Sequence, residues 1–232
     1  MVSGSMYKER LFLVGYEVDY SKQMFRNSVL LRVDNPNDDP TAWIYDAVNI
    51  PVFRENLFLS SCIFMSEINV YLFGTDLNSS STIISRINSE EVEFLNVSNI
   101  EYYGVMGGKQ GWYTSSNVSL TAVFPKAMSE FTLFFHPLLK QFYVLSLLPF
   151  ENQITLYLSN DLIGPWKPSP FFSLPSPYND TKQVFCYAPK AHPQFSSPNQ
   201  ITFSFNSDSF DFAMLLNEWV YTPQFYVATI LE

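Results

Sequence analysis

Short apolar runs, some alternating and some continuous, recur along the whole chain and are separated by turn-rich segments. Runs of this length are typical of β-strands. The predicted strands form three groups and an incomplete fourth: Arg10–Val18, Asn27–Val33 and Ala42–Asp46; Leu57–Phe64, Val70–Gly74 and Thr82–Ile87; Glu130–Phe135, Phe142–Leu148 and Ile154–Ser159; Ile201–Phe205 and Phe225–Leu231. The predicted turn regions are Asp34–Thr41, Ser159–Pro170 and Ser173–Thr181. Because no helical period persists beyond about two turns, an all-β fold is expected. The segment Phe210–Trp219 could form either a short helix or an outer strand.

One segment of this pattern appears twice. Leu11–Val33 and Val70–Ile87 each contain a strand, a glycine, an acidic turn and a second strand that closes on arginine and an aliphatic residue. The equivalent residues are Gly15 and Gly74, which are 59 residues apart, and Arg32 and Arg86, which are 54 residues apart. A repeat of this length built from short strands predicts the blades of a β-propeller.

The predicted strands do not complete a closed ring of blades. Aligning the first copy on the second leaves no room upstream for an inner strand comparable to Leu57–Phe64. We therefore expect a five-bladed type of β-propeller that lacks its first blade and one inner strand. It would occupy residues 6–232 as a single domain, with residues 1–5 interpreted as a cloning remnant. An open ring leaves strand edges unpaired, so self-association through an open propeller edge is expected.

Composition and charge narrow the function classes. With 47% hydrophobic residues, including 22 Phe and 14 Tyr, the chain is too apolar to be disordered. The net charge of −9 argues against a nucleic acid partner, because that affinity comes from Lys and Arg on phosphates. Cys62 and Cys186 lie far apart without zinc-type spacing, and separate buried thiols are expected.

The most apolar stretch, Phe131–Phe150, predicts a hairpin and no membrane span, because His136-Pro137 and Lys140-Gln141 interrupt it. His136 is expected at the surface, at the tip of that hairpin. Met1–Glu9 is short and polar, so no signal peptide is recognised in this chain.

Two ionisable residues lie where the innermost strand of a blade is expected to begin. Glu130 precedes Phe131–Phe135, and His192 precedes Pro193–Phe195. These positions are equivalent in neighbouring blades, so both side chains are expected at one cavity at the channel mouth. A carboxyl group that loses hydration in an aromatic channel holds its proton more readily, which suits a general acid. The alternatives are an exposed turn glutamate and a turn histidine satisfied by the backbone.

Aromatic side chains near turns, such as Trp112 and Tyr187, could stack on sugar rings. However, 17% of the chain is aromatic, and most of these residues must belong to the core.

Three segments resemble a known family. Met128–Pro137 (MSEFTLFFHP) is similar to the Ser-Glu-aromatic opening of a late blade, and Ser159–Trp166 (SNDLIGPW) to a Ser-x-x-Leu-x-Gly-Pro-Trp turn. Tyr187–Phe195 (YAPKAHPQF), followed by Phe203-Ser204-Phe205-Asn206, resembles the His-Pro-Glu and Ser-Tyr-Asn pattern of a last blade. Together they resemble the five-bladed propeller glycosidases acting on furanosides, which include arabinanases, xylosidases and invertases. The most similar members are domains first described without a function, some of which degrade D-arabinan.

The resemblance implies that the chain acts on or binds furanoside-containing polysaccharide and that it is extracellular or secreted. It implies Glu130 as the general acid. The implied substrate-binding residues are His192, Tyr187, Lys190, Trp112 and Asn206. No cofactor is implied, although the resemblance allows a calcium ion in the channel.

The family's set of catalytic carboxylates is incomplete in this sequence. The family's first-blade aspartate, which acts as base or nucleophile, has no counterpart in this chain. Glu55 is only a weak substitute for the family's second aspartate. The family's His-Pro-Glu motif is His192-Pro193-Gln194 here, with glutamine in place of glutamate. Glycoside hydrolysis needs two carboxyl groups about 5–9 Å apart, depending on whether configuration is retained or inverted. Three functions therefore stay open: a glycoside hydrolase or a piece of one, a non-catalytic carbohydrate-binding propeller, and a protein-interaction propeller.

Overall fold

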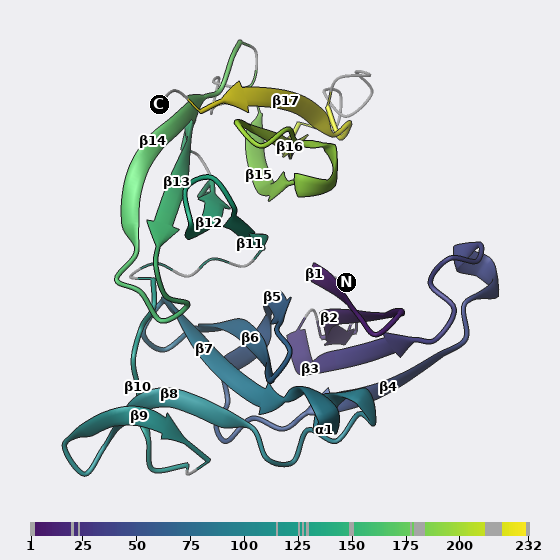
Figure 1. Cartoon of the computed structure of the whole chain (residues 1–232), viewed down its shortest axis with the longest axis vertical. Coiled ribbons are helices and arrows are strands. Elements are labelled where there is room, and N and C mark those ends of the chain that lie inside the picture. The colour runs from purple at the N-terminus through teal and green to yellow at the C-terminus, as the bar shows by residue number, and fades with distance from the viewer. Residues whose placement is uncertain are drawn as a thin grey trace. The chain divides into compact units, whose positions relative to one another are not determined.

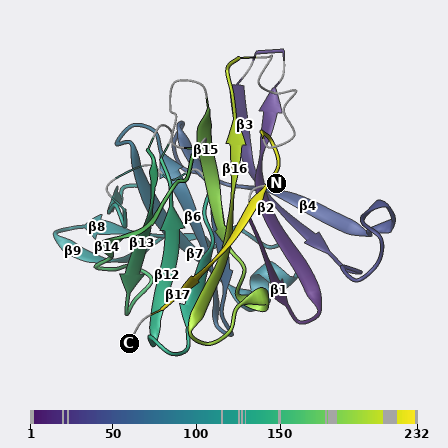
Figure 2. The same cartoon turned by 90° about the horizontal axis from the view of Figure 1, so that it is seen from above.

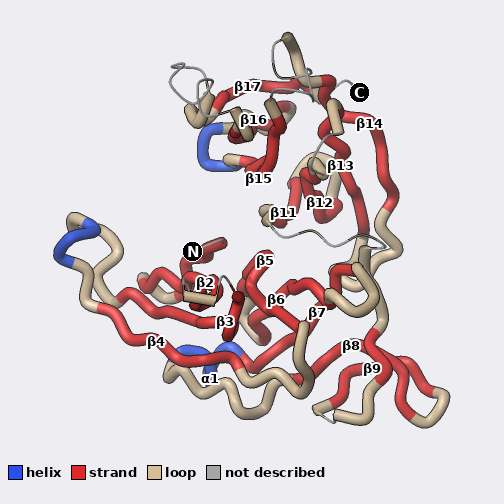
Figure 3. Tube along the Cα trace, turned by 180° about the vertical axis from the view of Figure 1, so that it is seen from behind, coloured by secondary structure: helices blue, strands red, loops and turns tan. Residues whose placement is uncertain are grey.

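The computed structural model describes residues 3–19, 21–22, 24–114, 116–124, 126, 128, 130–148, 151–176, 178, 184–211 and 220–230. The chain forms two compact units, Met1–Glu130 and Phe131–Glu232. Strands make up most of the regular structure of both units (Figure 3). Among the described residues, no helix has the length and hydropathy that crossing a membrane requires.

The first unit contains two antiparallel sheets (Figure 1). The first sheet has the order β1 (Ser3–Tyr7), β2 (Arg10–Asp19), β3 (Met24–Val33), β4 (Tyr45–Ile50). The second sheet contains β5 (Leu57–Met65), β6 (Asn69–Asp76), β7 (Ser81–Asn88), β8 (Glu101–Met106) and β10 (Ser119–Leu120), and β9 (Lys109–Tyr113) pairs with β8. Two short helices, η1 (Pro40–Ala42) and α1 (Ser89–Glu93), lie in the connections.

The second unit also contains two sheets. The third sheet of the chain has the order β11 (Leu133–His136), β12 (Gln141–Ser146), β13 (Gln153–Ser159), β14 (Lys167–Ser173). The fourth has the order β15 (Phe185–Ala191), β16 (Gln200–Asp208), β17 (Gln224–Thr229), and these strands lie side by side in Figure 2. A single-turn helix, η2 (Pro193–Phe195), connects β15 to β16.

The all-β prediction is confirmed, and the described residues form four blade-like sheets, as many as the predicted strand groups, each with up-and-down antiparallel strands at its centre. That they belong to a five-bladed type lacking its first blade stays a prediction, but the predicted absence of an inner strand was wrong. The first sheet has its inner strand, because β1 (Ser3–Tyr7) pairs with β2 through registers such as Ser5 opposite Phe12. Because this strand contains glycine and serine, it shows no hydrophobic pattern typical of a strand. It begins within residues 1–5, the segment interpreted as a cloning remnant.

The sequence repeat is confirmed as the second and third strands of two sheets. Leu11 pairs with Val33 across β2 and β3, and Val70 pairs with Ile87 across β6 and β7. Arg32 lies opposite Phe12 just as Arg86 lies opposite Tyr71. The two hairpins differ in the length of their turn, which explains why the glycine and arginine spacings differ.

Each unit has its own apolar core between its two sheets. In the first unit, Phe12 and Val14 on β2 pack with Leu59 and Leu72 of the second sheet. The core of the second unit joins two sets of buried residues: Tyr143, Leu145 and Ile154 from the third sheet, and Ile201, Phe203 and Phe205 from the fourth. Burying one such side chain stabilises the fold by roughly 1.5–3 kcal/mol, so these clusters hold each pair of sheets together.

Several element predictions were incomplete. Strands β8, β9 and β15 were missed, and β14 lies in a region predicted as turn. Strand β14 contains Pro168 and Pro170, which an edge strand tolerates because its outer N–H groups need no partner. The predicted Phe131–Phe150 hairpin is present as β11 and β12. Of Phe210–Trp219, residues 212–219 lie outside the described residues.

The cysteine prediction is confirmed. Cys62 on β5 and Cys186 on β15 are both free and buried. Burial raises the pKa of the Cys186 thiol to about 12, which keeps it in its unreactive protonated form.

Gly74 lies where the backbones of β5 and β6 approach each other closely. Strand β5 bulges between Phe58 and Cys62, and its backbone turns towards Gly74 on β6. A Cβ atom added at Gly74 would lie 2.1 Å from the carbonyl oxygen of Phe58 and 2.8 Å from the Cα atom of Leu59. Only glycine allows this approach without moving one of the two strands.

We predict that Gly74→Ala lowers the free energy of unfolding by about 1–3 kcal/mol, because an added methyl must displace packed backbone. Gly111→Ala on β9 is the matched control, since its Cβ would meet no atom closer than 3.4 Å. Urea unfolding measures both. Equal midpoints for the two variants would contradict the close approach of β5 and β6.

Candidate functional site

Glu130 is positioned by a segment that crosses the end of the β6–β7 hairpin. The Thr82 hydroxyl donates to the carbonyl oxygen of Lys126 at 2.8 Å and accepts from the Met128 N–H at 2.9 Å. Thr75, which pairs with Thr82, donates to the carbonyl oxygen of Met128 at 3.5 Å. These bonds hold the backbone two residues before Glu130 against the second sheet. Glu130 itself is half-buried and lies just ahead of β11.

Tyr16 on β2 lies near Glu130. Partial burial and the negative charge of Glu130 both raise the pKa of the Tyr16 hydroxyl. Tyr16 pairs with Ser28, whose hydroxyl accepts from the Leu59 N–H at 2.7 Å and so ties the first sheet to the second. The negative charge of Glu130 therefore reaches the Tyr16 hydroxyl.

A second carboxylate, Asp76, ends β6 in the same unit. Its side chain is only 4% exposed and forms an ion pair with Arg54 at 2.6 Å. Asp76 also accepts from the Ser79 hydroxyl at 2.6 Å and from the Asn78 N–H at 3.2 Å. Sequence reasoning noted Asp76 only as an acidic turn residue. Its three partners make it a structural anion, whereas Glu55, the weak substitute for the family's second aspartate, is exposed.

The fourth sheet gathers four of the predicted substrate-binding residues on one face. Residues opposite each other in an antiparallel pair share a face of the sheet. Lys190 lies opposite Ser204, and Tyr187 lies opposite Asn206. A bulge between Tyr187 and Lys190, with Ala188 at a φ of 49°, adds one residue and keeps both side chains on that face. We call this set, together with His192 and Phe225, the polar face of the fourth sheet.

His192 follows β15 and joins this face through side-chain contacts. Its Nε2 atom lies 2.7 Å from the Ser204 hydroxyl, and its ring centroid lies 5.2 Å from that of Phe225. Partial burial and the positive charge of Lys190 lower the pKa of His192, so the ring is neutral at pH 7. Phe225 and Phe195, which both contact the ring of His192, remain 58% and 69% exposed.

The predicted equivalence of Glu130 and His192 was wrong. Glu130 precedes the first strand of its sheet, whereas His192 follows β15, the first strand of the fourth sheet. Pro193–Phe195 is a 3₁₀ turn and not an inner strand. Pro189 is the reason that the sequence pattern did not predict β15 as a strand. The strand accommodates Pro189 in its bulge. Glu130 belongs to the first unit and His192 to the second, and a shared cavity stays a prediction.

Trp112 lies on the β8–β9 hairpin, far along the sequence from the residues of the polar face. The Arg86 guanidinium lies 4.5 Å from its ring centroid, and Tyr103 lies 5.2 Å from it. Arg86 is also paired with Glu101 at 2.7 Å. Because these neighbours already contact the indole, Trp112 has a structural role in this hairpin, and its contact with a sugar stays a prediction.

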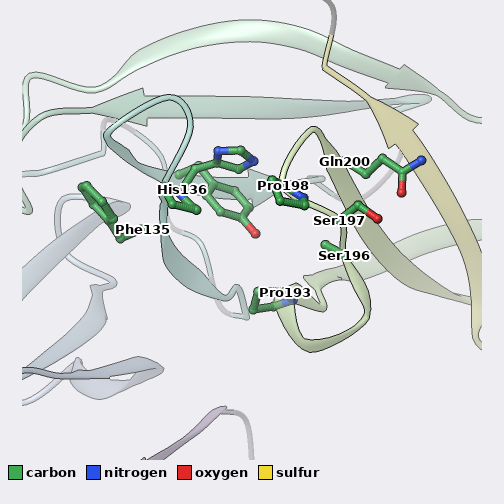
Figure 4. Close-up of a pocket in the computed structure, with 9 residues that line it drawn as sticks. Phe135, His136, Pro193, Ser196, Ser197, Pro198 and Gln200 are labelled. Atoms are coloured by element: carbon green, nitrogen blue, oxygen red, sulfur yellow. The ribbon is translucent and has the colours of Figure 1, made fainter.

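A pocket of about 220 Å³ lies within the second unit (Figure 4). The third sheet contributes Phe135, His136, Pro137 and Tyr143, and the β15–β16 connection contributes Pro193, Ser196, Ser197, Pro198 and Gln200. The expected surface position of His136 was wrong, because its side chain is only 4% exposed. The 193–200 connection lies more than 50 residues later in the chain, so no local pattern could reveal that it covers His136.

Among the described residues, no group of three or more His, Cys, Asp and Glu side chains is arranged to hold a metal ion. The calcium ion allowed by the resemblance therefore stays a prediction.

Comparison with known proteins places the chain in a family without assigning a function. Residues 11–228 match a family described as "Domain of unknown function (DUF5005)", and the chain belongs to this family. No curated protein matches the sequence. A solved structure described as "Structure of RS223-Beta-xylosidase" is similar over 98% of this chain and 90% of its own, with 8% sequence identity and a TM-score of 0.34. At that TM-score, the similarity carries no argument about fold or function.

We predict that Arg54→Met lowers the free energy of unfolding by about 1–3 kcal/mol, because it leaves the buried Asp76 carboxylate without its cation. Lys8→Met, which removes an exposed partner of Glu93, is the control and should cost much less. Chemical denaturation measures both changes. A loss no larger than that of the control would show that Asp76 does not depend on Arg54.

Proposed function

We propose that this chain binds carbohydrate on the polar face of the fourth sheet, with furanoside-containing polysaccharide as the ligand class. The observation that carries the proposal is the arrangement of His192, Ser204 and Phe225 on that face. The opposite face of β16, with Phe203 and Phe205, is committed to the core of the second unit. The polar-face side chains lie outside this core; Ser204 is buried, whereas Phe225 beside it is exposed to a ligand.

The chemistry of this face suits a sugar. A sugar ring has apolar C–H faces that pack on aromatic rings, and hydroxyl groups that need both donors and acceptors. Phe225 and Phe195 supply exposed rings near the neutral imidazole of His192, which has one nitrogen engaged by Ser204. Asn206 and Lys190 add an amide and a cation on the same face. The resemblance of Tyr187–Phe195 to the last blade of furanoside-acting glycosidases supports the ligand class.

The polar-face proposal predicts that His192→Ala and Phe225→Ala each weaken binding of soluble arabinan by about 5- to 30-fold, corresponding to about 1–2 kcal/mol. Phe94→Ala is the control, because Phe94 is 77% exposed but lies in the first unit beside α1. Affinity electrophoresis in arabinan gels measures the three variants against the parent chain. Wild-type levels of retardation for both polar-face variants would overturn the proposal.

Hydrolysis of the bound polysaccharide is a second candidate function, with Glu130 as the general acid. The half-buried position of Glu130 just ahead of β11 favours it. Within the described part of the chain, no Lys, Arg or His forms an ion pair with Glu130, in contrast to Asp76. The partner carboxylate remains unidentified, because Asp76 is engaged by Arg54 and Glu55 is exposed. This is why binding, and not turnover, is the function we propose first.

If the chain has furanosidase activity, Glu130→Gln should lower turnover of a polysaccharide about 10²–10⁴-fold, because the amide cannot deliver a proton to the leaving oxygen. Binding should be nearly unchanged. Turnover of an activated aryl furanoside should fall far less, because its leaving group needs little protonation. Equal losses of turnover on both substrates would show that the role of Glu130 is structural. Binding by the wild-type chain without any turnover would support carbohydrate binding as its only function. Self-association and an extracellular location also stay predictions.

A further inference from the structure

The pocket beside His136 is a separate feature from the polar face. None of the polar-face residues lines it. Figure 4 shows Phe135 and His136 on one side and Ser196, Ser197, Pro198 and Gln200 on the other, with Pro193 at the rim. Both walls belong to the second unit, the first from β11 and the second from the connection that begins with η2.

Two polar side-chain groups of this pocket form no hydrogen bond within the described part of the chain. The Leu139 N–H donates to Nδ1 of His136 at 3.3 Å, which places the proton of the neutral ring on Nε2. Burial lowers the pKa of His136, so this neutral form is present at pH 7. Neither Nε2 of His136 nor the hydroxyl of Tyr143 forms a hydrogen bond within the described part of the chain. The two side chains are 4% and 2% exposed.

In the pocket the two groups present one donor, Nε2–H, and one group that both donates and accepts, the Tyr143 hydroxyl. Neither belongs to the fully buried atoms without a partner in the described part of the chain, so solvent in the pocket reaches both. The rings of His136 and Tyr143 meet edge to face with centroids 5.8 Å apart, so the two groups are held in a fixed relation. A ligand that bonds to both would replace this solvent with partners that are already held in place, which reduces the ordering cost of binding.

The lining also defines the charge and shape of the ligand. No Asp, Glu, Lys or Arg lines the pocket, so a charged ligand would lose hydration without gaining a counter-charge. Phe135 and the prolines at 137, 193 and 198 supply apolar surface for C–H groups. The volume is below the range of about 300–1,000 Å³ that holds drug-sized ligands. A single small ring with several hydroxyl groups fits these limits.

We propose that this pocket binds one neutral sugar ring, with Nε2–H of His136 and the Tyr143 hydroxyl as hydrogen-bonding partners and Phe135 and the prolines as apolar walls. It is a binding site additional to the polar face of the fourth sheet. The polar face, with its exposed Phe225, would follow an extended chain, whereas this pocket of about 220 Å³ is partly open and would accept a single residue or a chain end. The two proposals rest on different residues and can fail independently.

The two histidines of the chain make the test selective, because one lies in each site. We would titrate D-glucose, D-xylose and L-arabinose separately into the protein and record the imidazole nitrogen resonances by NMR. At least one sugar should shift the Nε2 resonance of His136. D-Glucuronate, which adds a negative charge to the same ring, should shift it far less at equal concentration.

Tyr143→Phe keeps the ring and removes only the hydroxyl, so the dissociation constant from this titration should rise about three- to tenfold, the effect of one hydrogen bond. Leu138→Ala is the control, since Leu138 lies on the same hairpin but does not line the pocket. If Tyr143→Phe fails to fold, Gln200→Ala at the mouth of the pocket provides the second variant.

The proposal is overturned if none of the three sugars shifts His136, if glucuronate binds as well as glucose, or if Tyr143→Phe and Gln200→Ala bind like the parent chain. A shift of His192 alone would also overturn it, while supporting the polar face. A shift of His136 with an unaffected His192 supports the pocket whatever the arabinan experiments show.

Discussion

Each sheet of this protein depends on burying one face against its neighbour within the same unit. The core of the first unit joins β2 and β3 to β5, β6 and β7, and that of the second joins β12 and β13 to β15 and β16. Side chains alternate between the faces of a strand, so committing Phe203 and Phe205 to the core places Ser204 and Asn206 on the opposite face. The polar face is thus a consequence of the packing that stabilises the unit.

Much of the strand pattern could be predicted from the sequence because its hydrophobic runs are long and its repeat is regular. The pairing of Leu11 with Val33 and of Val70 with Ile87 follows directly from the repeated segment. The failures have local causes. Strand β1 consists of small and polar residues around Met6, and β15 contains Pro189 in a bulge. Backbone pairing with a neighbour defines both strands, and that pairing leaves little trace in hydrophobicity.

The candidate sites were only partly predictable for a similar reason. His192, Lys190, Tyr187 and Asn206 were found by their motif, and the structure places them on one face because a bulge corrects the register of β15. The sequence could not place Phe225 at this site, because Phe225 lies on β17 and contacts His192 only once the strands of the fourth sheet have paired. The burial of His136 depends on residues far along the chain, as does the pairing of Arg54 with Asp76. Long-range contacts of this kind are not encoded in any short pattern.

The distribution of the two cysteines has a consequence for studying the stability of each unit. The first unit contains Cys62 and the second contains Cys186, and both thiols are buried. A thiol of this kind reacts with a labelling reagent only when the structure around it opens, so the rate of labelling measures the free energy of that opening. Mass analysis of partly labelled protein therefore distinguishes two units that open together from two that open separately, without adding any probe to the chain.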